Sequence, residues 1–298
     1  MPLIKRGSIL VKSFHERLAS DDFQVLARVI PPKSPELSST LSSISSWKGK
    51  VDSLLVSDNQ SARMGISSLV LAERLGRDGN DVIMTISCRD RNRIALGSTA
   101  LGCAALSIGS ILCVSGDHFN FGDHPEAKPV YDLDSVQLIS MIREMEKGRD
   151  GGGNALEGAL SFCLGAAVCA TADPLGPQLM KARKKVAAGV DFFVTLPIFT
   201  IDQLGPFLDA AKDMPVKIIA GVLLPSYAEI VRYQDGSIPG TFIPDSVVRA
   251  WRDDGEDDFL STSVEHVRKL VSLLRESGRV TGVCISANGR ELEIGSLL

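Results

Sequence analysis

Eight short runs rich in Val, Ile and Leu recur along this chain, and helical stretches separate them. Short apolar runs bounded by turn residues indicate buried strands, whereas apolar residues spaced three and four apart indicate amphipathic helices. The predicted strands are Gln24–Ile30, Ser53–Val56, Asp81–Ser87, Ser110–Val114, Ser161–Ala167, Phe192–Thr195, Lys217–Val222 and Val280–Ser286. The predicted helical stretches include Ala62–Arg77, Arg91–Ser107, Leu133–Lys147, Gly176–Gly189, Ile201–Lys212, Tyr227–Tyr233 and Val264–Ser277.

This alternation predicts a single (β/α)8 TIM barrel that spans residues 1–298 as one domain. A doubly wound open sheet stays an alternative, because periodicity does not distinguish an open parallel sheet from a closed one. The hydrophobic content of 44% supports a large core, and the aromatic content of only 5% favours helix–sheet packing over an aromatic-rich β-sandwich. Two polar segments, Arg149–Asn154 and Arg252–Asp258, are predicted to be surface loops.

Charge and cysteine usage exclude several classes of function. The net charge of −4 provides no basic field for nucleic acid or an anionic membrane surface, so a small molecule or another protein is the expected partner. The six cysteines form no C-x-x-C pair and are interpreted as reduced thiols. No apolar run reaches about 18 residues, and the first residues lack a signal-peptide pattern. A cytoplasmic location is therefore expected.

The segment Ile111–Ser135 is the strongest candidate for a functional loop. A buried strand ends at Ser115, Gly116 and Asp117, and about twenty residues without helical or strand periodicity follow. Parallel barrels carry their chemistry at the carboxyl ends of the strands, so Asp117 is a candidate site residue. The alternative is that Asp117 only caps a turn.

Motifs for other kinds of site are absent or weak. The chain has neither G-x-G-x-x-G nor a P-loop, so both common nucleotide fingerprints are missing. His118 and His124 occur in a D-H-x5-D-H pattern that superficially resembles a metal site. Pro125 and the loop position favour hydrogen-bonding or surface roles, and we predict no metal. His15 and His266 lie in helical stretches and are expected to be solvated.

Several motifs together resemble the methylenetetrahydrofolate reductase family, from about Pro31 to Arg290. The strongest are C-R-D-R-N-R at 88–93 and G-D-H-P-E-A-K-P-V-Y-D-L-D-S at 122–135, which follows the S-G-D of the fourth strand. P-P-K at 31–33, the segment from Ala172 to Thr195 and I-P-G-T-F-I-P-D at 238–245 also fit. The resemblance implies a flavoprotein barrel that binds FAD at its mouth without a Rossmann fingerprint.

The resemblance also implies roles for individual residues. Asp117 would lie beside the flavin pyrimidine edge and tune its hydride affinity, since a nearby carboxylate disfavours an anionic reduced flavin. Ser57 matches a flavin-contacting threonine, and Thr85 falls where many members carry a histidine. Ser115 and Gly116 belong to the same predicted cofactor site.

Three further positions match the family's ligand contacts. Lys184 and Lys185 match a basic pair that meets the FAD diphosphate; the alternative for adjacent lysines is a solvated helix face. Tyr227 matches an aromatic residue that stacks on folate or nicotinamide, and a tyrosine without a ligand is its alternative.

Two positions depart from the family pattern. The family's glutamate before P-P-K, the general acid of the folate reaction, is replaced by Arg28, and the glutamine that contacts folate and nicotinamide is replaced by Leu196. A guanidinium stays protonated, so Arg28 does not replace the acid. Asp90 and Glu36 are unranked candidates for another proton donor.

The resemblance thus implies reduction of methylenetetrahydrofolate to methyltetrahydrofolate, with NADH, NADPH or a partner protein as electron donor. Two alternatives stay open: a diverged flavoprotein that acts on another acceptor or with a partner electron-transfer subunit, and a non-catalytic subunit of one-carbon metabolism. A homo-oligomer is compatible with each. Function depends on the site more than on the fold.

Overall fold

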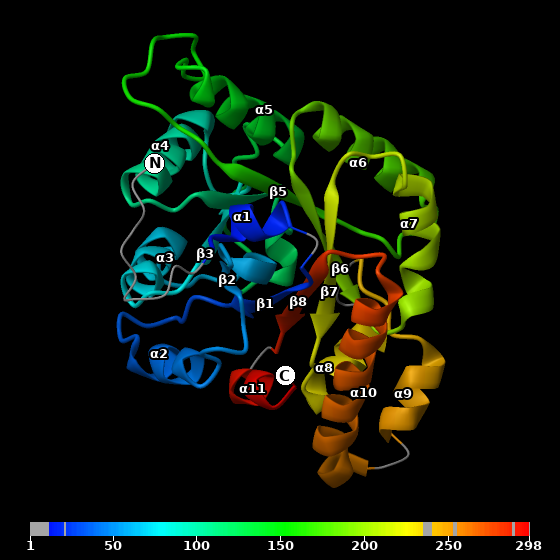
Figure 1. Ribbon diagram of the computed structural model, residues 1–298. Helices are drawn as coiled ribbons and strands as arrows, with labels where there is room; N and C mark the ends of the chain where they lie inside the picture. Colours follow the sequence, from blue (N-terminus) through cyan, green and yellow to red (C-terminus); the bar gives the residue numbers. More distant parts are fainter. Residues whose placement is uncertain (1–11, 21, 235–239, 253–254, 288–289, 298) are drawn as a thin grey trace.

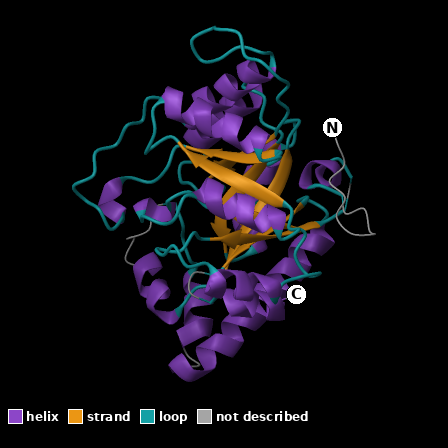
Figure 2. Ribbon diagram, turned by 90° about the vertical axis from the view of Figure 1, so that its left-hand side faces the viewer, coloured by secondary structure: helices purple, strands orange, loops and turns teal. Residues whose placement is uncertain are grey.

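The computed structural model describes residues 12–20, 22–234, 240–252, 255–287 and 290–297. Eight parallel strands form a closed barrel in sequential order, and helices surround it (Figures 1 and 2). The strands are β1 (Gln24–Val29), β2 (Ser53–Val56), β3 (Val82–Ser87), β4 (Ser110–Val114), β5 (Cys163–Val168), β6 (Phe192–Ile198), β7 (Lys217–Leu223) and β8 (Gly282–Ser286). The predicted TIM barrel is confirmed, and the open-sheet alternative is wrong.

The described helices follow the predicted order but differ at their ends. They are α1 (Phe14–Leu18), α2 (Ser38–Ser45), α3 (Ser68–Arg77), α4 (Arg93–Ala105), α5 (Ser135–Glu146), α6 (Gly176–Ala187), α7 (Gly205–Ala211), α8 (Tyr227–Gln234), α9 (Asp245–Arg252), α10 (Gly255–Ser277) and α11 (Ile294–Leu297). Short 3-10 turns η1 (Gln60–Ala62), η2 (Phe119–Phe121), η3 (Ile201–Gln203) and η4 (Glu291–Glu293) lie between them.

Two predictions about these helices were wrong. The helix expected from Ala62 begins only at Ser68, because Ser61 and Ala62 have positive φ angles of 54° and 56° that break an α-helix. The polar segment Arg252–Asp258 was expected to be a loop, but α10 already begins at Gly255. Four further helices, α1, α2, α9 and α11, were not identified from sequence periodicity, and each of them has eight or fewer residues.

The barrel separates two apolar cores. Inside it, alternate strand residues such as Leu26, Leu55 and Ile83 meet Phe14 and Leu18 of α1, which crosses the amino-terminal end of the barrel (Figure 1). Outside it, the other strand residues pack against the helices. A smaller aromatic cluster joins α8, α9 and α10 beside β6 and β7. With one end closed by α1, the carboxyl ends of the strands form the open mouth.

None of the described helices is both long enough and apolar enough to cross a lipid bilayer.

Candidate functional site

Two layers of inward-facing side chains line the mouth of the barrel. Residues two positions beyond the interior core residues of a strand also point inward, and the strand registers set their relative heights. The lower layer comes from odd-numbered strands and contains Arg28, Thr85, Ala167 and Gly221. The upper layer comes from even-numbered strands and contains Ser57, Val114 and Ser286, whereas a register shift between Val194 and Pro197 interrupts the alternation on β6. The structure therefore brings together three of the predicted site residues: Arg28, Ser57 and Thr85.

Arg28 lies half-buried in the lower layer. Its Nε donates a hydrogen bond to Ser286 Oγ at 3.0 Å. The guanidinium also faces the thiol of Cys284: burial raises the pKa of that thiol, and Arg28 opposes the rise. Arg28 forms no ion pair in the described part of the chain, and it is the only charged side chain of the two mouth layers.

The hydroxyl groups beside Arg28 differ in their partners. Ser57 is buried, and its Oγ donates to Gln60 Oε1 at 2.7 Å. Thr85 is 4% exposed, and its Oγ1 has no hydrogen-bond partner among the described residues. A buried hydroxyl without a partner is costly, which makes Thr85 a candidate for contact with a ligand.

The loop after β4 lies across the loop after β2 at the rim of the mouth. Asp117 is exposed, and its Oδ2 accepts a hydrogen bond from Ser61 N at 3.2 Å. The Asp123 carboxylate accepts a hydrogen bond from Met64 N at 3.2 Å and forms an ion pair with Lys33 Nζ at 2.5 Å. The hydrogen bond that Lys33 donates holds the pKa of Asp123 well below its usual range. The G-D-H segment of the predicted signature thus joins three rim loops.

Strained backbone supports this rim. Asn59, Ser61 and Ala62 all have positive φ angles, although none of them is glycine, the residue that adopts such angles without strain. Gly122 fits against Ala62, because a Cβ at Gly122 would lie 2.0 Å from Ala62 O. Such strained positions cluster at functional sites, where the surrounding contacts hold them.

Arg89 anchors the rim from below. It is 1% exposed, and its Nη atoms donate to the carbonyl oxygens of Asp117 and Asn59 at 3.1 and 3.0 Å. Burial opposes its charge, but the hydrogen bonds and ion pair with Asp90 raise its pKa. Burial likewise opposes the charge of Asp90, and the bonds from Arg89 and Asn59 still lower its pKa. Asp90 is therefore a poor proton donor near neutral pH, while Glu36 is exposed outside the mouth layers.

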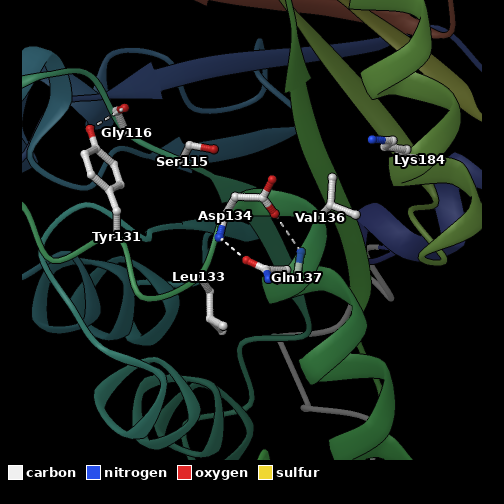
Figure 3. A pocket seen from close by; sticks show the side chains of 8 residues that line it. All are labelled: Ser115, Gly116, Tyr131, Leu133, Asp134, Val136, Gln137 and Lys184. Atoms are coloured by element: carbon white, nitrogen blue, oxygen red, sulfur yellow. Dashed lines mark hydrogen bonds between the residues drawn. The ribbon is translucent and has the colours of Figure 1, made fainter.

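A cavity of about 610 Å³ lies beside the mouth, between the end of β4, α5 and α6 (Figure 3). It is lined by Ser115, Gly116, Tyr131, Leu133, Asp134, Val136, Gln137 and Lys184. Gly116 has a φ of +94°, and a Cβ there would lie 2.4 Å from Ser87 Oγ, so this wall must be bare backbone. Tyr131 Oη donates to Gly116 O at 3.2 Å, and Asp134 caps α5 by accepting from Gln137 N at 2.9 Å.

The predicted lysine pair is divided between two environments. Lys184 is exposed and lines this cavity from α6, as Figure 3 shows. Lys185 is 6% exposed and does not line it; instead its Nζ donates to Ala167 O, 2.5 Å away in the barrel wall. Burial lowers the pKa of Lys185 to about 8, and the nearby charge of Lys181 adds to this effect.

This burial predicts a pH-dependent stability. Above pH 8 Lys185 is neutral in the folded chain but still protonated in the unfolded chain up to about pH 10.5, so its contribution to the free energy of unfolding rises with pH over that window. Lys185→Met should therefore stabilise the protein below pH 8, by up to about 3 kcal/mol, and lose this advantage near pH 10.5. Urea unfolding at pH 7 and pH 10 checks this, with the exposed Lys184→Met as the matched control. An equal effect of Lys185→Met at both pH values would contradict it.

The two predicted substrate contacts have different surroundings. Leu196 is half-buried at the register shift of β6, where a Cβ on Gly240 would come within 2.7 Å of its Cδ1. Tyr227 begins α8, and its ring packs edge-on against Phe259 at 5.5 Å within the aromatic cluster of α8–α10. The Tyr227 ring is thus packed against another side chain of the protein. Ile238 and Pro239 of the predicted motif lie outside the described residues.

The histidines form no metal site in the described chain, where no group of three or more potential metal ligands occurs. His118 caps η2, and His124 contacts Asp123 Oδ1 at 2.7 Å. The expectation that His266 is solvated was wrong. It is half-buried, contacts Phe199 O at 2.8 Å and packs edge-on against Trp251, and burial lowers its pKa.

Four residues of the site were missed by sequence reasoning: Arg89, Tyr131, Asp134 and Ser286. The first three fall within the C-R-D-R-N-R and G-D-H…D-L-D-S motifs, so the motifs themselves carried the signal. Ser286 is the last residue of the predicted eighth strand, and the sequence assigns it no role. Its hydrogen bond to Arg28 depends on the pairing of β1 with β8, which joins residues 258 positions apart.

Comparisons with known proteins agree with this architecture. The family model of methylenetetrahydrofolate reductase matches residues 13–294. A solved structure of an uncharacterized protein from Clostridium thermocellum, described as binding two copies of 5-methyl-5,6,7,8-tetrahydrofolic acid, has a TM-score of 0.63 at 14% identity and covers 95% of each chain. A 2,3-dimethylmalate lyase of the PEP mutase/isocitrate lyase superfamily has a TM-score of 0.50 at 10% identity, covering 90% of this chain and 75% of that chain.

At these identities the structural matches establish the fold alone, and no functionally curated protein matches the chain significantly. The family match is of a different kind, because it covers nearly the whole barrel, including both mouth layers and the cavity beside them. The chain belongs to the methylenetetrahydrofolate reductase family.

Proposed function

We propose that this protein binds FAD and a reduced folate at the barrel mouth and interconverts 5,10-methylenetetrahydrofolate and 5-methyltetrahydrofolate. The family match over residues 13–294 is the observation that carries the proposal. The methyltetrahydrofolate bound by the Clostridium thermocellum protein, which shares the barrel, supports the folate part. Electrons would come from NADH, NADPH or a partner protein.

The residues at the mouth fit FAD. The cavity beside β4 combines a cation for a phosphate group, Lys184, with a carboxylate for ribose hydroxyls, Asp134. Leu133 and Val136 supply apolar surface, and the bare backbone at Gly116 permits close approach of a ligand. Ser57 and Thr85 supply hydroxyl groups at the adjoining mouth, and the Thr85 hydroxyl has no partner in the part of the chain that the structure describes.

When bound, FAD would supply hydride transfer between the electron donor and the folate. In this proposal Asp117 places a negative charge at the rim and disfavours an anionic reduced cofactor. Lys184 holds the diphosphate, and Lys185 would join it only by leaving Ala167 O. Arg28 excludes a protein-derived proton at the family's glutamate position, so the proton for the folate would come from water.

Arg28 also favours a second candidate function. A cation in place of an acid, together with Leu196 in place of a glutamine, removes two polar contacts to folate that the family resemblance implies. A flavoprotein that reduces another acceptor, alone or with a partner subunit, fits these two replacements.

Anaerobic mixing of the FAD-loaded protein with 5-methyltetrahydrofolate separates the two candidates. Loss of the visible absorbance of the oxidised flavin is the result expected for a folate reductase. Flavin that stays oxidised with methyltetrahydrofolate but is reduced by NADH or NADPH would favour the second candidate. Failure of the purified protein to bind FAD would contradict both, and Lys184→Met is expected to weaken FAD binding in either case.

A further inference from the structure

We propose that Arg28 and Thr85 form a carboxylate-binding site inside the barrel mouth. The proposal deepens the proposed function, because Thr85 also lies in the part of the mouth assigned to FAD, but its test requires neither bound FAD nor an intact folate. The chemical requirement of the site is a small planar anion that accepts hydrogen bonds from a guanidinium and a hydroxyl group.

The first observation behind this site is the charge of Arg28. Only its Nε is bonded to a described side-chain oxygen, that of Ser286, and Cys284 is its other polar neighbour. Apart from these two neighbours, the guanidinium has no acidic partner among the described residues. A half-buried cation without a counter-ion is costly, and an anionic ligand offsets this cost.

The second observation is the buried hydroxyl group of Thr85. The register places Thr85 in the same layer as Arg28, two strands away, and its Oγ1 is buried without a partner. The other members of the layer, Ala167 and Gly221, have no polar side-chain atom. An anion in this layer thus has the guanidinium and the Thr85 hydroxyl as its only side-chain donors.

The charge balance selects a carboxylate over a phosphate. Arg28 is the only cation in the two mouth layers, so it neutralises one negative charge, whereas a phosphate monoester brings nearly two near pH 7. The guanidinium fork matches the two oxygens of a carboxylate. The carboxylate can belong to a small organic acid or to the glutamyl tail of a folate, and binding measurements distinguish these sources.

The test is calorimetric titration of the full-length protein with acetate and with p-aminobenzoylglutamate, at matched ionic strength in chloride. Binding of at least one of these carboxylates is expected, with affinity reduced at least tenfold in Arg28→Gln. Tighter binding of acetate would identify a small acid as the occupant, and tighter binding of p-aminobenzoylglutamate would identify the folate tail. Inorganic phosphate should bind more weakly than the preferred carboxylate.

Thr85→Val provides the second variant, and it keeps the volume of the side chain. Because it removes a buried hydroxyl that lacks a partner, it should leave the melting temperature of the ligand-free protein unchanged or raised, while it weakens carboxylate binding several-fold. No binding of either carboxylate, or equal binding in Arg28→Gln, would overturn the proposal. A lowered melting temperature with unchanged binding in Thr85→Val would overturn the role of Thr85.

Discussion

Replacing Arg17 with methionine is expected to lower the free energy of unfolding by about 3–5 kcal/mol. Arg17 is buried beneath the barrel, where its Nη2 pairs with Asp81 at 2.8 Å and donates to Asp52 O at 2.8 Å. Its Nε donates to Gln24 Oε1 at 2.8 Å. The substitution would leave the Asp81 carboxylate without its counter-ion in a largely buried position, and removal of one member of a buried ion pair is costly for that reason.

The same substitution would also loosen the end of the barrel. Asp81 accepts a hydrogen bond from the backbone of Phe14 at 2.6 Å, and Phe14 packs edge-on against Phe192 at 4.9 Å inside the barrel. The Arg17–Asp81 pair therefore holds α1 across the opening. Arg74→Met is the matched control, since Arg74 pairs with Asp78 on an exposed helix face and should change stability by less than about 1 kcal/mol. Urea unfolding at pH 7 measures both, and equal effects would contradict this account.

Replacing Arg28 with glutamate is expected to raise the rate of the folate half-reaction by about 10²-fold. A positioned general acid contributes about 10²–10⁴-fold to such reactions, and the family resemblance implies that Arg28 occupies the position of the glutamate that acts as this acid. The lower end of this range is expected, because Leu196 still replaces the glutamine. The measurement is the rate at which methyltetrahydrofolate removes the visible absorbance of the FAD-loaded protein under anaerobic conditions.

Arg28→Gln separates proton donation from the mere loss of a positive charge. If the missing acid limits the reaction, only Arg28→Glu accelerates it, and both variants lose the carboxylate binding proposed for Arg28. Equal acceleration by both variants would mean that the cation itself hinders the folate. If neither variant accelerates the reaction, residues of the mouth other than residue 28 also limit it.

Much of the site was predictable because its residues follow strand ends. Arg28, Ser57 and Thr85 lie in or directly after buried strands, so their convergence follows from the parallel order of the barrel. The roles of adjacent residues were not predictable in this way. Lys184 and Lys185 are neighbours in sequence, but about 100° of helix rotation separates them, so one lines a cavity and the other is buried against β5.

The amino-acid sequence by itself determined the barrel, the family and the strand ends that form the mouth, because apolar periodicity and short motifs are local properties of the chain. Only the tertiary structure decided that, among the described residues, Arg28 has no acidic partner and the Thr85 hydroxyl has no hydrogen-bond partner, and that Asp117 accepts a hydrogen bond from Ser61 N. These facts depend on contacts between strands and loops that are distant in sequence. Strand register, barrel closure and loop packing set those contacts, and no local pattern encodes them.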